Sequence, residues 1–241
     1  MLLRLENAAA AMNTLQQSQD QTANNLANAN TTGYKRDRFF TEALNERLDA
    51  ERAPRSDRRL QQAADMSAGA MKQTENPLDM ALGGDGFFEV QPEGGDATHY
   101  TRAGHFTIGR DGTLRTPDGR QVMGEGGPIQ IPVDEPGNIN VAKDGTITAG
   151  EQRIGRLKVV SVDNPAQMER REGASFVAGG ATPEPMEDPT VLQGMVETSN
   201  VSPVEEMTNM IQTSRQYEAQ QRSLQATNDT LSRATQDLGQ L

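Results

Sequence analysis

Apolar residues in the first thirty positions recur at alternating spacings of four and three residues. The series runs through Met1, Leu5, Ala8, Met12, Leu15, Gln19, Thr22, Leu26 and Ala29, and the residues between are mostly Asn, Gln and Ala. This is the a/d spacing of a coiled coil, although Gln19 and Thr22 weaken it. The pattern predicts an N-terminal helix that stops at Gly33.

A second helix is predicted at the C-terminal end. Its apolar positions recur every seven residues, at Met210, Tyr217, Leu224, Leu231 and Leu238. Ser202 is expected as the N-cap, Pro203 as the first helical residue and Glu205 as the other half of a capping box. Val204, Met207 and Ile211 are expected to widen the same apolar face at its start. A helix from 203 to 238 would be about 54 Å long, which is typical of a coiled coil.

The middle of the chain reads as antiparallel β structure. Short strand-like runs occur at Phe87–Val90, His99–Arg102, Phe106–Ile108, Ile139–Val141, Ile147 and Leu157–Val162. Asp-Gly pairs at 85–86, 111–112, 118–119 and 144–145 supply the positive-φ residues of tight hairpins. Many short strands with such turns predict a small sheet or barrel.

Glycine and proline mark the boundary between these regions. Of 23 glycines, only Gly33 precedes residue 69 and only Gly239 follows residue 194; ten of the 12 prolines lie between Pro77 and Pro189. Both residue types break helices. We therefore predict an α+β protein with an N-terminal arm (1–33), a connecting segment (34–75), a β-rich central domain (76–196) and a C-terminal arm (197–241), the two arms forming a coiled coil.

Three shorter segments carry weaker signals. Phe40, Leu44 and Leu48 are spaced for a short helix, and Arg52–Arg59 reads as an exposed linker. Gly179–Pro189 reads as a loop.

Composition and charge narrow the function. Hydrophobic residues make up 34% of the chain, against about 45–50% in an average soluble domain, so part of the chain is expected to find apolar partners elsewhere. A net charge of -11 disfavours binding to nucleic acid or to an anionic membrane. The absence of cysteine excludes disulfides and a Cys nucleophile. No apolar run is long enough for a secretory signal or a membrane span, so we expect a cytoplasmic chain or one exported without cleavage.

A search for catalytic or metal chemistry finds little. His99 and His105 are too few for a zinc site without carboxylate help, and exposed side chains are the favoured interpretation. Ser175 lacks the G-x-S-x-G setting of a nucleophile elbow. Gly83–Glu89 begins like a phosphate loop but lacks the final Gly and the Lys-Ser/Thr pair. We therefore predict no catalytic residue, no metal and no cofactor.

A family resemblance rests on a run that ends the first helix. Asn24-Asn25-Leu26-Ala27-Asn28-Ala29-Asn30-Thr31-Thr32-Gly33-Tyr34-Lys35 resembles the N-N-L-A-N-x-x-T-x-G-[FY]-K signature of the flagellar rod and hook axial proteins. Further resembling runs follow in the same order: Leu78–Leu82, Gly86–Val90, Tyr100–Phe106, Gly194–Val201, and Met210–Gln212 with Tyr217-Glu218.

The resemblance implies a structural subunit of the bacterial flagellum. Such proteins pack their termini as a coiled coil, polymerise helically into a rod or hook, and pass through the flagellar type III export apparatus without a cleavable signal. The implied location is the periplasmic rod of the basal body, and the implied partners are other copies and other rod proteins. A chain with one modest β domain fits a proximal or distal rod component, and the short linker and Val122–Ile129 favour the proximal one.

The resemblance and the two apolar seams together give a predicted assembly interface. Its members are Leu5, Met12, Leu15, Asn24, Asn25, Leu26, Asn28, Gly33, Met210, Tyr217, Leu224, Leu231 and Leu238. The alternative from another class is a secreted cell-wall hydrolase or binding module that uses its helices as an anchor. The few aromatic residues of the middle give that alternative little material for a binding pocket.

Overall fold

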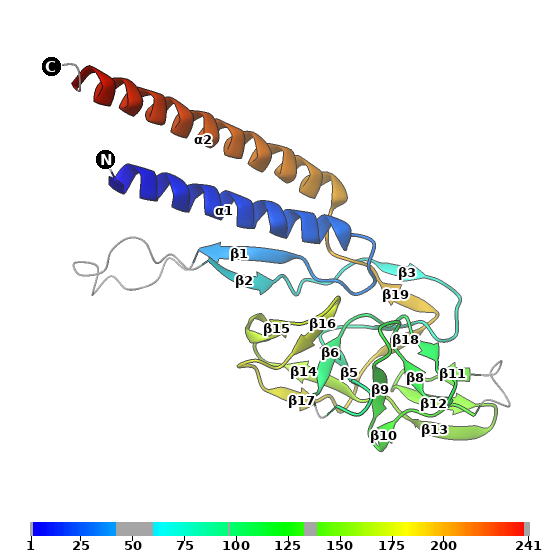
Figure 1. Cartoon of the computed structure of the whole chain (residues 1–241). Coiled ribbons are helices and arrows are strands. Elements are labelled where there is room, and N and C mark those ends of the chain that lie inside the picture. The colour runs from blue at the N-terminus through cyan, green and yellow to red at the C-terminus, as the bar shows by residue number, and fades with distance from the viewer. Residues whose placement is uncertain (1, 42–59, 96, 133–138, 239–241) are drawn as a thin grey trace. The chain divides into compact units, whose positions relative to one another are not determined.

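The computed structural model of the protein describes residues 2–41, 60–95, 97–132 and 139–238. It divides into two compact units, which we name by their content. The helical unit comprises residues 1–27, 38–62 and 202–241, and the β unit comprises residues 28–37 and 63–201. The prediction of an α+β protein with long terminal helices is confirmed (Figure 1).

The helical unit is built on two long helices. Helix α1 spans Leu2–Ala27 and helix α2 spans Pro203–Leu238, beginning at the predicted proline. The two helices pack against each other and run in opposite directions, so that α2 begins where α1 ends (Figure 1). Strands β1 (Asp37–Thr41) and β2 (Leu60–Ala64) pair as a two-stranded sheet.

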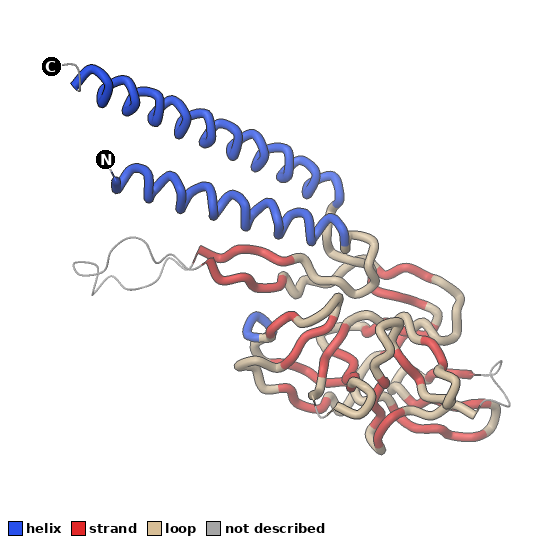
Figure 2. The backbone as a smooth tube through the Cα atoms, in the orientation of Figure 1, coloured by secondary structure: helices blue, strands red, loops and turns tan. Residues whose placement is uncertain are grey.

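The β unit is organised around one large sheet (Figure 2). Its main path has the order β15-β16-β6-β5-β9-β8-β7, with β14 pairing to β5 and to β17, and β10 pairing to β9. The strands are β5 (Phe87–Gln91), β6 (His99–Thr101), β7 (Thr107–Ile108), β8 (Leu114–Arg115), β9 (Gln121–Gly124), β10 (Gly127–Pro128), β14 (Val159–Val162), β15 (Glu169–Arg170), β16 (Ser175–Val177) and β17 (Pro183–Pro185). A short 3-10 helix, η1 (Pro165–Gln167), precedes β15.

Three small sheets complete the β unit. Strands β11 (Ile139–Val141), β12 (Thr146–Ala149) and β13 (Gln152–Arg156) form an antiparallel meander. Strand β4 (Met80–Leu82) pairs with β18 (Val191–Gln193), and β3 (Met71–Gln73) pairs with β19 (Met195–Glu197). These last two ladders bring residues 71–82 beside residues 191–197.

The core of the β unit is apolar, with aromatic rings at its centre. Phe88 and Phe106 lie edge to face with ring centroids 5.2 Å apart, and around them pack aliphatic side chains from several strands. A second cluster includes Phe87 and Phe176, whose ring centroids are 6.2 Å apart. Edge-to-face pairs add stabilisation beyond that of the buried area.

The predicted turn chemistry is right at three of the four Asp-Gly pairs. Gly112, Gly119 and Gly145 all have positive φ. The prediction is wrong at 85–86, where Gly84 takes the positive φ of +114°. Gly86 instead lies buried against Val159 as the chain enters β5, so a side chain there would meet the neighbouring strand.

Three other expectations need correction. Helix α1 ends at Ala27, so Gly33 lies beyond a turn and does not stop the helix. Phe40 lies in strand β1, so it does not begin a helix; Leu44, Leu48 and residues 52–59 lie outside the described residues. The segment Gly179–Pro189 contains β17, which pairs only with β14 and so tolerates its prolines on the edge of the sheet.

Candidate functional site

The predicted seam of α1 lies on the side of the helix that is least exposed. Met12, Leu15 and Leu26 are half-buried, while Thr22 and Asn25 are buried, at 6% and 2% exposure. The predicted positions therefore lie on the less exposed side of α1, and the two residues buried there are polar. Thr22 donates its hydroxyl proton to the Ser18 carbonyl at 2.8 Å, which removes the cost of burying that hydroxyl.

The seam of α2 contains residues that the seven-residue pattern did not identify. Met210, Tyr217 and Leu224 are half-buried as expected. Four polar residues alternate with these apolar positions at spacings of four and three, and each is buried or half-buried: Glu206, Thr213, Gln220 and Thr227. The sequence analysis missed these residues because it looked for burial only at apolar positions. The a/d spacing, continued from the apolar positions, would have identified them.

Three apolar residues at the start of α2 do not belong to this seam. Val204, Met207 and Ile211 are 74%, 52% and 55% exposed. At about 100° of rotation per residue they lie roughly 120° around the helix from Glu206, Met210 and Thr213. The expectation that they widen the seam is wrong, and they form a separate exposed stripe.

The other members of the predicted interface are distributed unevenly. Asn24 is exposed and Asn28 is half-buried, and both have polar partners. The side chains of Leu5, Leu231 and Leu238 lie outside the described residues. The assembly role of the whole set stays a prediction.

The end of the resembling run enters the β unit at a tight backbone contact. Gly33 donates its amide proton to the Glu197 carbonyl at 2.8 Å and has a φ of +67°. A Cβ at this position would lie well inside the distance of a van der Waals contact with the Ala103 amide nitrogen. Gly33 is therefore required by its conformation and by this close approach.

Next to Gly33 lies a buried ionic cluster, which we call the Lys35–Glu197–Arg102 cluster. The side chains of Lys35 and Glu197 are each 1% exposed, and the Lys35 Nζ donates to a Glu197 carboxylate oxygen at 2.5 Å. The same carboxylate accepts from the Gly69 amide at 2.9 Å, and Arg102 contacts its second oxygen at 3.4 Å. Glu197 therefore pairs with two buried cations, and its single negative charge balances one of them.

The surroundings of the cluster disfavour an uncompensated charge. Burial lowers the pKa of Lys35 from its ordinary value, and the hydrogen bond to Glu197 opposes that effect. Lys35 also donates to the Ser67 carbonyl at 2.8 Å, and Arg102 donates to the Gly84 carbonyl at 2.7 Å. These bonds satisfy donors that burial would otherwise leave unpaired.

Asn200 ties three segments of the β unit together. Its side-chain amide donates to the Asp65 and Ser67 carbonyls at 2.9 and 3.1 Å. Its side-chain oxygen accepts from the Arg36 amide at 2.7 Å. We call the bonded region of residues 33–37, 65–69 and 197–200 the junction, since the chain leaves it toward α1, β1, β2 and α2.

Arg170 supports the junction from strand β15. Its guanidinium lies 4.3 Å from the ring centroid of Tyr34 and 4.8 Å from that of Phe176, and it pairs with Asp37 at 3.0 Å. Stacking and pairing of this kind suit arginine better than lysine.

The resembling runs contain several residues of the junction and of the ionic cluster, to which the sequence assigned no such role. Lys35, Arg102, Glu197 and Asn200 all lie in those runs. The charged types carried no local signal of burial, since Lys35 stands beside Arg36 and Arg102 beside Thr101. Arg170 lies outside every run, and nothing in the sequence marked it.

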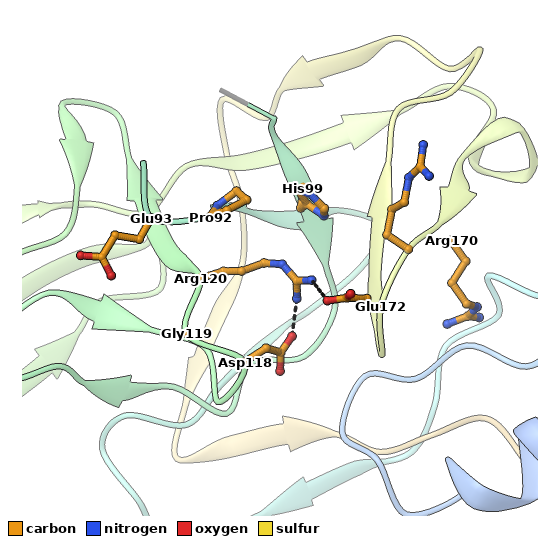
Figure 3. A pocket seen from close by; sticks show the side chains of 9 residues that line it. Pro92, Glu93, His99, Asp118, Gly119, Arg120, Arg170 and Glu172 are labelled. Carbon is orange, nitrogen blue, oxygen red and sulfur yellow. Dashed lines mark hydrogen bonds and ion pairs between the residues drawn. The ribbon is translucent and has the colours of Figure 1, made fainter. Parts of the chain in front are cut away.

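A pocket of about 780 Å³ includes Arg170 of strand β15 in its lining (Figure 3). It is lined by Pro92, Glu93, His99, Asp118, Gly119, Arg120, Arg170, Arg171 and Glu172. Arg120 lies between the carboxylates of Asp118 and Glu172 and pairs with both (Figure 3). Arg170 and Arg171 pair with Asp37 and Glu169. The cations of the pocket are thus already neutralised, which disfavours a site for a small anion.

The two histidines have different surroundings. His99 is half-buried in this pocket, contrary to the expectation of exposure, and burial with the nearby Arg120 and Arg171 lowers its pKa. His105 is about half exposed, and its Nδ1 lies 2.7 Å from an Asp79 carboxylate oxygen. Among the described residues no group of three or more His, Asp or Glu is placed to hold a metal ion. Neither described helix is long and apolar enough to cross a membrane.

Comparison with known proteins identifies the same segments. The family model for flagella basal body rod proteins matches residues 5–35, and the D1 domain of the flagellar hook protein FlgE/F/G matches residues 81–149. The C-terminal model of the flagellar basal body rod FlgEFG proteins matches residues 192–237. The two terminal matches cover the junction residues Gly33, Lys35, Glu197 and Asn200.

Similar curated proteins extend over nearly the whole chain. The flagellar basal-body rod protein FlgF of Caulobacter vibrioides is 34% identical, covering 95% of this chain and 94% of its own. FlgF of Salmonella typhimurium is 37% identical, covering 94% of both. FlgG of Buchnera aphidicola from Acyrthosiphon pisum is 32% identical, covering 89% of this chain and 91% of its own. By length, by order of motifs and by these matches, the chain belongs to the family of flagellar basal-body rod proteins, within which it is most like FlgF.

Proposed function

We propose that the chain is a structural subunit of the flagellar basal-body rod that polymerises through its terminal helices. The observation that carries this proposal is the character of the helix pair. Its seam mixes half-buried apolar residues with buried polar ones, and a further apolar stripe on α2 is exposed. Helices of this kind gain much of their stability from packing against additional partners.

In this proposal α1 and α2 act as a coiled coil and the β unit is carried outside it. The a/d spacings on both helices support the coiled coil. The four-part division of the chain at residues 33, 75 and 196 stays a prediction, as does the grouping of the 13 interface residues. Relatives named as basal-body rod proteins support a place in the basal body and association with other rod proteins.

Export without a cleaved signal through the flagellar type III apparatus is a further part of the proposal. A helix pair with little dry core is easily unfolded for passage and can order on incorporation. The proximal rod, which the family resemblance favours, is the proposed position; among the relatives named above, the two FlgF proteins are more similar to the chain than the FlgG protein.

The chain is proposed to be non-catalytic. The Asp79–His105 pair is the nearest approach to a catalytic dyad, since it could orient an imidazole. No hydroxyl or carboxylate is recorded in contact with the free side of that imidazole among the described residues. Nothing observed therefore favours the alternative of a cell-wall hydrolase or binding module with helical anchors.

Two substitutions test assembly through the seam. Leu26→Asp or Leu224→Asp places a carboxylate in the half-buried seam, where its desolvation opposes packing. The expected result is exported protein that is missing from purified basal bodies and loss of motility. The matched control is Gln225→Asp, which puts the same charge on the exposed neighbour of Leu224. Normal assembly of the Leu224→Asp protein would overturn the proposal.

A further inference from the structure

The exposed stripe of Val204, Met207 and Ile211 is the most prominent apolar feature of the helical unit. These three residues account for all but one of the large exposed hydrophobic side chains in the described chain, and they lie on one side of one helix. Farther along that side α2 becomes charged, with Glu218 and Arg222 forming an ion pair at 3.3 Å. The stripe is therefore a bounded patch about 10 Å long at the beginning of α2.

The size and charge of the patch restrict what can cover it. Three side chains bury far less than the roughly 1,600 Å² of a standard interface, so the patch cannot hold a dimer together by itself. The chain carries a net charge of -11, and most of its surface repels a second copy. A covering surface on another copy has to be uncharged and reachable.

Helix α1 offers one such surface. Its stretch from Asn7 to Gln19 contains no charged residue, between Glu6 and Asp20. Within it Ala10, Asn13 and Gln17 are exposed and share one side of the helix, away from the half-buried Met12, Leu15 and Gln19. Thr14 turns its hydroxyl back to the Ala10 carbonyl at 3.0 Å, which leaves its methyl group outward. An apolar patch can pack here without burying a charge.

The patch and this surface are offset from each other along the helix pair. Helix α2 begins where α1 ends, whereas Ala10 lies about 25 Å along α1 from Ala27 (Figure 1). Two different surfaces displaced along an axis can make a heterologous contact, which repeats in an open series where its rotation does not close. This is the contact that a rod requires.

We infer that the Val204–Met207–Ile211 patch of one copy packs on the outer side of Asn7–Gln19 of α1 in a second copy of this chain. This inference rests on the proposed function and names the partner surface for it. The helix pair then uses its seam within the subunit and its patch between subunits.

The absence of cysteine allows a clean cross-linking test. Met207→Cys is combined in turn with Ala10→Cys, Asn13→Cys and Gln17→Cys in the full-length chain, expressed in the source bacterium, and basal bodies are purified under mild oxidation. We expect disulfide-linked dimers and higher oligomers, joined between residue 207 and α1, from at least one double variant. Met207→Cys alone should give no dimer. The matched control replaces Met207→Cys with Gln212→Cys, an exposed position on a different side of α2, and should lose the ladder.

Each other outcome counts against the inference. Dimers from Met207→Cys alone would mean a contact between identical patches, and a disulfide to another rod protein engineered with its own cysteine would name a different occupant. If the double variants are incorporated into basal bodies but form no disulfide, the inference is overturned while the proposed function stands. Absence of the unmodified chain from basal bodies would overturn the proposed function itself. If Met207→Cys prevents incorporation into the basal body, the same test is made with Ile211→Cys and the same three cysteine positions on α1.

Discussion

The two units of this protein bury their side chains in opposite ways. In the β unit most of the fully buried side chains are apolar, among them Met80, Phe88 and Leu114 at 0% exposure, and the charged exceptions Lys35 and Glu197 are paired with each other. In the helical unit, among the described side chains, the buried ones are polar: Thr22, Asn25, Glu206 and Thr213. Its apolar residues are half-buried or exposed.

This difference separates folding from assembly. The β unit removes its apolar surface from water within one chain, so its stability comes from burial. The helical unit leaves apolar surface uncovered and gains less from its own packing. We expect the two units to respond differently to the same chemical change.

The largest expected effect is at the Lys35–Glu197–Arg102 cluster. Glu197→Met leaves Lys35 and Arg102 buried without their carboxylate, and removing one partner of a buried pair typically costs about 3–5 kcal/mol. The free energy of unfolding of the β unit, measured in urea, should fall by that order. Lys35→Met introduces the same side chain but leaves Glu197 paired with Arg102, so its cost should be smaller. An equal or larger loss for Lys35→Met would contradict the view that Glu197 is the centre of the cluster.

The next prediction compares the stability cost of a leucine-to-alanine substitution in the β unit with its cost in the helical unit. Leu114→Ala removes a side chain that is 0% exposed in the β core, at an expected cost of about 2–5 kcal/mol. Leu224→Ala acts on the half-buried seam, and its cost should be below about 1.5 kcal/mol, the lower bound for a fully buried leucine. Thermal unfolding of the β unit should be lowered by the first and unchanged by the second. A β transition that moves with Leu224→Ala would mean that the two units share one cooperative core.

A smaller loss of stability is expected from alanine substitutions at two glycines, which form a matched pair. Gly33→Ala meets both an unfavourable φ of +67° and the Ala103 backbone, whereas Gly119→Ala meets a φ of +85° with open space around it. Left-handed backbone costs an alanine roughly 1–2 kcal/mol in either place, so any excess at Gly33 measures the close approach. Urea unfolding of both variants checks this. Equal losses would show that the junction can move to admit a methyl group.

Sequence patterns predicted the helices and strands better than the contacts between them. The start of α2 at Pro203, its end at Leu238 and strands such as Ile139–Val141 follow from local signals of caps, periods and turns. Lys35 and Glu197 are 162 residues apart, and no local pattern specifies such a pairing. The polar seam residues Glu206 and Thr213 were missed because hydrophobicity was used as the sign of burial. The exposed stripe was misassigned because Val204 and Ile211 are apolar like the seam but point about 120° away from it.

The smallest effects are expected at two similar turns that begin with Asp-Gly-Thr. In both turns the aspartate accepts from the amide and the hydroxyl of the threonine two residues later: Asp111 from Thr113, and Asp144 from Thr146. Both carboxyl groups have a pKa below the ordinary value. For Asp111 the main cause is the hydroxyl of Thr113, 2.6 Å away, followed by Arg115. For Asp144 the main cause is the backbone amide of Thr146.

Replacing each threonine by valine separates these causes, because valine keeps the amide and loses the hydroxyl. Thr113→Val should raise the pKa of Asp111 more than Thr146→Val raises that of Asp144, as read from carboxyl carbon shifts in an NMR pH titration. A lowered aspartate pKa means that the folded state favours the carboxylate. Its stabilisation is therefore complete above the unfolded pKa of about 3.9 and disappears as the pH falls through the folded value. The free energy of unfolding of the Thr113→Val protein should accordingly be lower than that of the unmodified protein near neutral pH, and the two values should converge in acid. Equal shifts of the two aspartates would show that the two hydroxyls contribute alike, so that the shorter contact at Asp111 has no larger effect than the contact at Asp144.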